Sequence, residues 1–127
     1  MEFSAVVGIS TGIPGLKPGE QVIRTLDNRT IFIFGGKGAS VGWIVIQKLD
    51  RKYFYPDRPR FARDDAIENC KSFSECEIWR NVKFQDVFAR QVSFAMVPLE
   101  EALLRVWHYR RVVCIADSVN KVYPYSI

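Results

Sequence analysis

Residues 21–47, QVIRTLDNRTIFIFGGKGASVGWIVIQ, hold the pattern that decides the fold. β-Branched and aromatic residues dominate three runs in this stretch, Gln21–Leu26, Thr30–Phe34 and Val41–Gln47, and each run is predicted to form a strand. Asp27-Asn28 separates the first two runs and is typical of a tight turn, while the glycine-rich residues 35–40 separate the second from the third. Strands joined by such short connections pair antiparallel, so we expect a meander.

The flanking segments extend this pattern to an α+β fold, a mostly antiparallel sheet with a few helices. Phe3–Ser10 is another apolar, β-branched run and predicts a strand, and residues 11–19 contain two Pro and three Gly, which predicts a surface loop. After the polar residues 50–60, Asp64 is expected to cap a helix that ends near Lys71. The remaining expected elements are a short helix over Val82–Arg90, a strand over Gln91–Val97, a helical or turn segment over Leu99–Leu104 and a strand over Arg111–Ile115.

The composition is that of one globular domain. The 127 residues are 48% hydrophobic and 25% charged, and 18 Lys plus Arg against 14 Asp plus Glu give a net charge of +4. These values exclude a disordered tail, a collagen-like repeat and a disulfide-dense miniprotein. No apolar run approaches the roughly 18 to 20 residues needed to cross a bilayer, and the start Met-Glu-Phe-Ser lacks the features of a signal peptide. We therefore expect an intracellular protein.

The cysteines do not form a metal-binding or disulfide pattern. Cys70, Cys76 and Cys114 are separated by five and 37 residues, which fits neither a CxxC metal knuckle nor a paired disulfide framework. His108 is the single histidine, and nothing in the sequence places it near a thiol. We expect structural thiols with no disulfide partner, and no metal site.

The stretch Arg51–Arg63 mixes basic and aromatic residues, as a surface that stacks single-stranded nucleic acid would. Acidic residues within and beside it, Asp50, Asp57, Asp64 and Asp65, cancel most of its positive field. A solvated loop with aromatic anchors is the simpler interpretation, and no nucleic-acid partner is expected.

The glycine-rich residues 35–40, GGKGAS, do not form a phosphate-binding motif. In a Walker A loop the lysine follows the last glycine and precedes Ser or Thr, whereas here Lys37 precedes Gly38. Both flanks are predicted strands, so a hairpin loop is expected.

Residues 110–124, RRVVCIADSVNKVYP, are the most informative for function. A buried-type strand ends in a small residue and an acid, Ala116-Asp117, and a polar turn and Pro124 follow. This arrangement resembles the second flavin-binding signature of the group A FAD-dependent monooxygenases, in which a strand ends in Gly-Asp before a variable stretch and Pro. The resemblance implies that Asp117, with Ala116 and Pro124 beside it, contributes to FAD binding, because a carboxylate at a strand end can accept hydrogen bonds from the ribityl hydroxyls.

The resemblance covers nearly the whole chain. Its further blocks are Val7–Ser10, Ile13–Glu20, Val41–Trp43, Lys48–Tyr53, Tyr55–Pro56, Trp79, Leu99–Glu101 and Trp107–His108. Together they are similar to the middle and late portions of fungal flavin monooxygenases that epoxidise prenyl chains in meroterpenoid and indole-diterpene biosynthesis.

The resemblance implies an oxidoreductase of fungal secondary metabolism that uses FAD to transfer oxygen to an alkene or arene. It divides the chain into a substrate-side sheet with helices, residues 1–110, and a partial second FAD-binding motif, residues 111–127. It also implies a small apolar or prenylated substrate, bound on the sheet face near Trp43 and Gln91–Val97. It assigns no catalytic residue.

The sequence departs from this family in four places. No Gly-x-Gly-x-x-Gly turn precedes Phe3, and only three residues follow Pro124. Ala116 stands where the family has Gly, and Asn120 stands where these fungal enzymes commonly carry His. We therefore expect a fragment or truncated homologue that does not bind FAD tightly or act alone. The alternatives are a cofactor-free cyclase or isomerase derived from the substrate domain and a non-catalytic remnant.

The strand at Val112–Ile115 has a further consequence. In the family it lies in a parallel sheet whose other strands come from an N-terminal part, so here we expect it to pack on the remaining sheet, aggregate or self-associate. The sequence leaves membrane association of the intact family member open.

Overall fold

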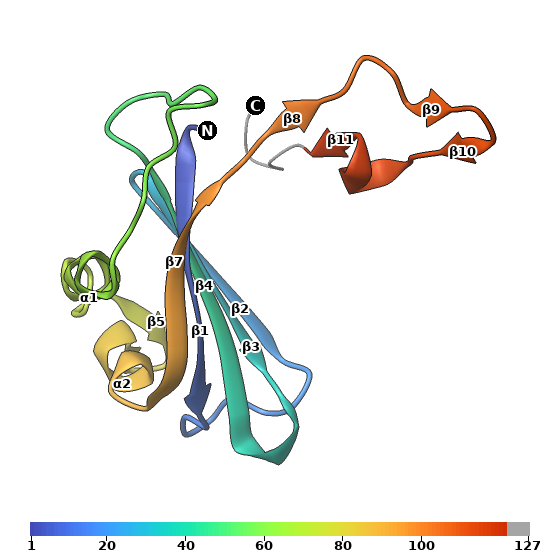
Figure 1. Cartoon of the computed structure of the whole chain (residues 1–127). Coiled ribbons are helices and arrows are strands. Elements are labelled where there is room, and N and C mark those ends of the chain that lie inside the picture. Colours follow the sequence, from blue (N-terminus) through green and yellow to red (C-terminus); the bar gives the residue numbers. More distant parts are fainter. Residues whose placement is uncertain (122–127) are drawn as a thin grey trace.

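A computed structural model describes residues 1–121 of the chain. Its main feature is a five-stranded antiparallel sheet in the order β2-β3-β4-β1-β7 (Figure 1). The strands are β1 (Phe3–Thr11), β2 (Gln21–Leu26), β3 (Arg29–Gly35), β4 (Ser40–Lys48) and β7 (Gln91–Leu99). The five strands expected for residues 3–97 are confirmed, each within two residues at either end.

The meander is confirmed only for β2, β3 and β4. β1 does not pair with β2; it lies between β4 and β7, the strand furthest from it in sequence among the five. The loop after β1, rich in Pro and Gly, leads the chain to the far edge of the sheet (Figure 1). The hairpin loop predicted at residues 35–40 is confirmed, and a 3₁₀ turn at Lys37–Ala39 closes it.

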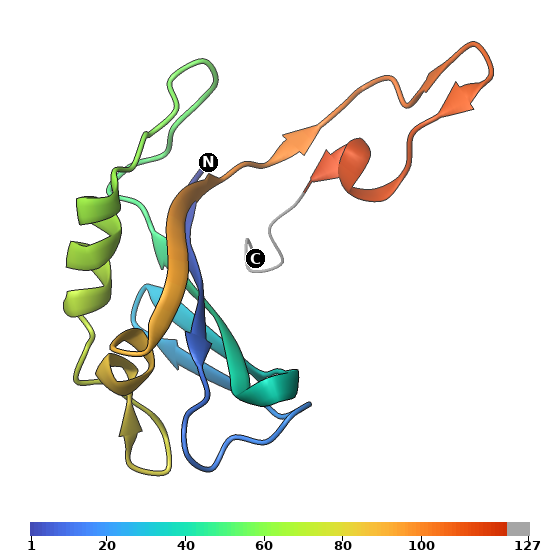
Figure 2. The same ribbon diagram turned by 60° about the horizontal axis from the view of Figure 1, so that its bottom comes forward.

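Two helices cover one face of the sheet (Figure 2). Helix α1 spans Arg63–Lys71 and helix α2 spans Phe84–Phe88. Because side chains alternate along a strand, every second residue of the sheet faces them. The core lies between these layers, and its members include Val6, Ile31, Ile33, Trp43 and Val45 from the sheet with Ala66, Cys70, Phe84 and Val87 from the helices.

Helix α1 begins differently from the prediction. Its N-cap is Ala62, which has no side-chain acceptor, and the carboxylate of Asp65 accepts a hydrogen bond from the Ala62 backbone N–H at 2.6 Å. The prediction that Asp64 caps the helix is therefore wrong, although both acids lie in the first turn, where the helix dipole favours negative charge.

The second predicted helix is shorter than expected. Val82–Lys83 forms strand β6, which pairs with β5 (Glu77–Trp79), and the helix begins only at Phe84. The backbone N–H of Lys83 donates to the Asp86 carboxylate at 2.8 Å, which fixes this helix start.

Residues 102–121 form an arm that leaves the sheet at the end of β7 (Figures 1 and 2). It contains two ribbons: β8 (Ala102–Leu103) with β11 (Asn120–Lys121), and β9 (His108–Tyr109) with β10 (Val112–Val113). The predicted helical or turn segment over Leu99–Leu104 is wrong, because β7 continues to Leu99 and β8 follows.

The predicted strand Arg111–Ile115 is also corrected. Only Val112–Val113 is extended and paired, and these side chains are 64% and 67% exposed rather than buried. An apolar run is buried only where another element covers it. Here β10 pairs only with the two-residue strand β9 among the described residues, so the side chains of Val112 and Val113 stay exposed.

Candidate functional site

The sheet face opposite the helices is apolar. It carries Val7 and Ile9 of β1, Ile44 of β4, Phe34 of β3 and Ala95 of β7, in the register that pairs these strands. Ile9 is 51% exposed, and Val7 and Phe34 are each 36% exposed. Aliphatic and aromatic side chains at this exposure lower the free energy when an apolar surface covers them. We call this surface the open face.

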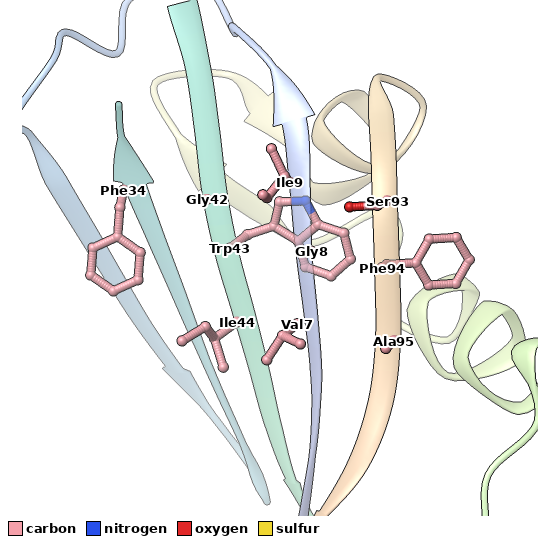
Figure 3. A pocket seen from close by; sticks show the side chains of 10 residues that line it. All are labelled: Val7, Gly8, Ile9, Phe34, Gly42, Trp43, Ile44, Ser93, Phe94 and Ala95. Atoms are coloured by element: carbon pink, nitrogen blue, oxygen red, sulfur yellow. The ribbon is translucent and has the colours of Figure 1, made fainter. Parts of the chain in front are cut away.

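A hollow of about 520 Å³ lies on the open face (Figure 3). Gly42 of β4 pairs with Ile9 on one side and Phe34 on the other, and a Cβ built on Gly42 would meet nothing within 4 Å. The missing side chain therefore produces the depression, with Ile9 and Phe34 as its flanks. Of its ten lining residues only Ser93 carries a polar side-chain group besides the indole of Trp43.

Trp43 lies beneath this hollow. Its indole is 1% exposed and occupies the helix-covered side, where its Nε1–H donates to Ser10 Oγ at 2.8 Å and Ser10 Oγ donates to the Val87 carbonyl at 2.8 Å. The space for the ring comes from Gly8 on β1, directly opposite Trp43 in the register. The substrate-binding role predicted for Trp43 stays a prediction; in the structure the ring forms the floor beneath the hollow and is packed in the core.

The sequence did not single out Gly42, Ile9 and Phe34. The available signal was the alternation of β4, in which a glycine interrupts an otherwise bulky face, but the pairing of β1 with β4 was needed to place Ile9 beside it.

The residues assigned to FAD by resemblance lie elsewhere. Ala116 and Asp117 belong to the 3₁₀ turn Ala116–Ser118 on the arm, and Asp117 is exposed. Pro124 lies outside the described residues. The hollow on the open face includes neither Ala116 nor Asp117, so the structure does not bring them together with Trp43.

The backbone at Ala116 has an unusual conformation. Its φ is +52°, in the left-handed region that favours glycine, and this is the position where the resemblance implies Gly. The FAD-binding role of Ala116 and Asp117 stays a prediction. The exposed carboxylate of Asp117 can accept hydrogen bonds from hydroxyls of a flavin ribityl chain. One carboxylate on one turn does not enclose a dinucleotide, so the described residues fit FAD only in part.

Titratable groups do not gather at the hollow. None of its ten lining residues is an acid, a base or a cysteine, and no cluster of three or more His, Cys, Asp or Glu able to hold a metal ion occurs within residues 1–121. Burial raises the pKa of the Cys70 thiol to about 12, which keeps this core cysteine protonated and unreactive. The hollow can bind and position an apolar ligand, and its side chains offer no acid–base chemistry. No helix of residues 1–121 has the length and apolar character needed to span a bilayer.

Comparison with known proteins finds relatives of the chain among the FAD-dependent monooxygenases of fungi. The chain is 43% identical over 124 residues to the FAD-dependent monooxygenase ctvC of Aspergillus terreus, which covers 98% of this chain and 26% of ctvC. It is 42% identical over 123 residues to verC2 of Penicillium polonicum, covering 97% of this chain and 32% of verC2. It is 41% identical over 124 residues to spyC of Aspergillus fumigatus, covering 98% of this chain and 26% of spyC.

The chain is thus a relative of the fungal FAD-dependent monooxygenases along nearly its whole length, which confirms the resemblance stated from the sequence. It spans about a quarter of the length of ctvC and spyC, and about a third of verC2. No model of a known protein family matches the chain, and no solved structure matches it.

Proposed function

We propose that this chain is the substrate-side section of an FAD-dependent monooxygenase of fungal secondary metabolism, and that its open face forms one wall of the substrate site. The observation that carries the proposal is the hollow at Gly42: an apolar depression on a sheet that is covered on its other face only, in a chain about 40% identical to FAD-dependent monooxygenases.

The chemistry of the hollow supports an apolar substrate. Ile9, Phe34 and Ile44 offer dispersion contacts and apolar area, and at about 520 Å³ the hollow lies in the size range of small-molecule sites. A prenylated aromatic matches these properties. Since the lining residues hold no titratable group, their part is to bind the substrate, exclude water and orient the bond to be oxidised.

Bound FAD would supply the activation of oxygen, which no side chain of this section provides. Asp117 would accept hydrogen bonds from the flavin ribityl hydroxyls, in a turn whose left-handed residue is Ala116. A cofactor-free cyclase is not favoured, because the relatives named above are FAD-dependent monooxygenases and the hollow has no acid–base pair.

The test is binding of a prenylated phenol to the chain, followed by the NMR signals of backbone N–H groups and of the Trp43 indole. We expect saturable shifts confined to β1, β4, the end of β3 at Phe34 and the middle of β7. Gly42→Leu should abolish them by filling the hollow, whereas Val92→Leu, at a site 68% exposed and not part of the lining, should leave them unchanged. Shifts centred on another surface, or unaffected by Gly42→Leu, would overturn the proposal.

A further inference from the structure

A second hollow, of about 560 Å³, lies on the helix-covered side of the sheet and has a different chemistry. It is bounded by the ends of β3 and β4, by helix α1 and by residues 53–61 of the loop before that helix. It shares no lining residue with the hollow at Gly42. Nothing in the proposed monooxygenase role uses it.

Arg29 is the central group of this second hollow. It opens β3 directly opposite Gln47 of β4, and both follow the alternation that puts Ile31 and Val45 in the core. Its Nε–H donates to Gln47 Oε1 at 3.2 Å, and its guanidinium lies 5.0 Å from the centre of the Phe73 ring. These contacts fix the plane of the guanidinium.

The terminal nitrogens of Arg29 make no hydrogen bond or ion pair with any of residues 1–121. An arginine carries five N–H donors, and only the one on Nε is hydrogen-bonded to a described residue. None of the four ion pairs among residues 1–121 includes Arg29. A half-buried guanidinium that is held in place, and whose two outer nitrogens are not bonded to any described residue, matches the two oxygens of a carboxylate.

A second unsatisfied group lines the same hollow. Asn69 of α1 has its Oδ1 buried without a hydrogen-bond partner among the described residues, although buried polar atoms are ordinarily paired. This oxygen can accept a hydrogen bond from a donor on the ligand. The apolar part of the lining comes from Phe61, Met96 and the Tyr53 ring, whose hydroxyl donates to Asp50.

The acids of the hollow do not compete for Arg29. Asp65 holds the backbone N–H of Ala62, and Glu68 makes no ion pair within the described part of the chain. Both are exposed, as is Arg60, so they form the rim, whereas Arg29 and Asn69 are half-buried.

We propose that this second hollow binds a small organic carboxylate that also carries a hydrogen-bond donor and an apolar body. The carboxylate accepts hydrogen bonds from the terminal nitrogens of Arg29, and the donor group of the ligand donates to Asn69 Oδ1. The apolar body of the ligand packs against Phe61 and Met96. This site lies on the helix-covered side of the sheet and is separate from the proposed substrate site on the open face.

Three related probes separate these contacts. Mandelate has the carboxylate, a hydroxyl donor and a phenyl ring; mandelamide lacks the charge, and phenylacetate lacks the hydroxyl. We expect mandelate to bind with a dissociation constant below about 1 mM, mandelamide about 10- to 100-fold more weakly and phenylacetate about 3- to 10-fold more weakly. Binding is followed by the NMR signals of the Arg29 side chain and of α1.

The variants test the assignment through selectivity, which a modest change of stability does not imitate. Arg29→Gln should remove the preference for mandelate over mandelamide, and Asn69→Ala should remove the preference for mandelate over phenylacetate. Arg24→Gln, at an exposed position on β2, and Gly42→Leu should change neither. If Arg29→Gln does not fold, the proposal is judged by whether Asn69→Ala removes the preference for mandelate over phenylacetate.

The proposal is overturned if mandelate gives no saturable shift at millimolar concentration, or if mandelamide binds as tightly as mandelate. It is equally overturned if both preferences survive in the variants that fold. Loss of mandelate binding in Gly42→Leu would place the ligand on the open face instead.

Discussion

Replacing Gly8 by alanine should destabilise the sheet through the indole of Trp43. A Cβ at this position would lie 2.1 Å from Trp43 Cζ2 and 2.5 Å from Cε2, closer than real side chains approach. The ring has no room to move, because it is 1% exposed, packs edge-on against Phe84 at 5.5 Å between ring centres, and donates to Ser10. Overpacking of this kind costs about 1 to 3 kcal/mol, and loss of the buried hydrogen bond would add about 1 kcal/mol.

Gly42→Ala is the matched control, since a Cβ there meets nothing within 4 Å. Alanine in place of a strand glycine with open space around it should be neutral or stabilising by about 0.5 to 1 kcal/mol. Urea unfolding followed by tryptophan fluorescence measures both free energies. The reasoning is refuted if Gly8→Ala is as stable as Gly42→Ala, because the close approach of β1 to Trp43 would then not exist.

Four further outcomes follow from the local geometry. Ala62→Ser supplies the N-cap acceptor that α1 lacks and should raise the free energy of unfolding by about 1 kcal/mol in a urea titration; no gain would mean that Asp65 already satisfies this helix start. Ala116→Gly relieves a φ of +52° and should stabilise the arm by about 1 kcal/mol, seen as slower hydrogen exchange there, with unchanged exchange counting against this backbone geometry. Val113→Lys, at a side chain 67% exposed, should leave the chain folded and reduce any self-association in light scattering; unfolding would show that Val113 is buried. Brief iodoacetamide treatment at about pH 8 should label the exposed thiol of Cys114 and spare that of Cys70, which is buried and kept protonated by its raised pKa. Mass spectrometry that finds Cys70 labelled and Cys114 unlabelled would contradict the exposure of these two side chains in the structure.

The long strands could be predicted from the sequence because each one contains enough β-branched and aromatic residues to identify it. The predicted bounds of β2, Gln21–Leu26, are those of the structure, and the fold class follows from the strands together with α1. The short strands could not be predicted, because strands of two residues, such as β8 and β9, are too short to show an alternation of apolar and polar residues. β8 also pairs with β11, which lies at the other end of the arm in sequence, so no local pattern indicates this pairing.

The sequence names Trp43 as a substrate-binding residue, and this role stays a prediction. Ile44 and Ile46 make the other face of β4 apolar as well, so alternation alone cannot tell which face the helices cover. The close approach of Gly8 to Trp43 is a property of the strand register, and no local pattern encodes it. The apolar run Val112–Ile115 predicts a buried strand, but the run itself does not reveal whether another element of the fold covers it.

The central claim is that this chain can serve as the substrate-side section of an FAD-dependent monooxygenase, with the hollow at Gly42 against the substrate. The most direct measurement replaces the matching section of the relative spyC by this chain and follows flavin content and substrate-dependent formation of oxidised product. We predict a chimera that retains bound flavin and forms product, and a Gly42→Leu version that retains the flavin and loses the product. A flavin-bound chimera whose product formation is unaffected by Gly42→Leu, or a well-folded chimera without any product, would contradict the account.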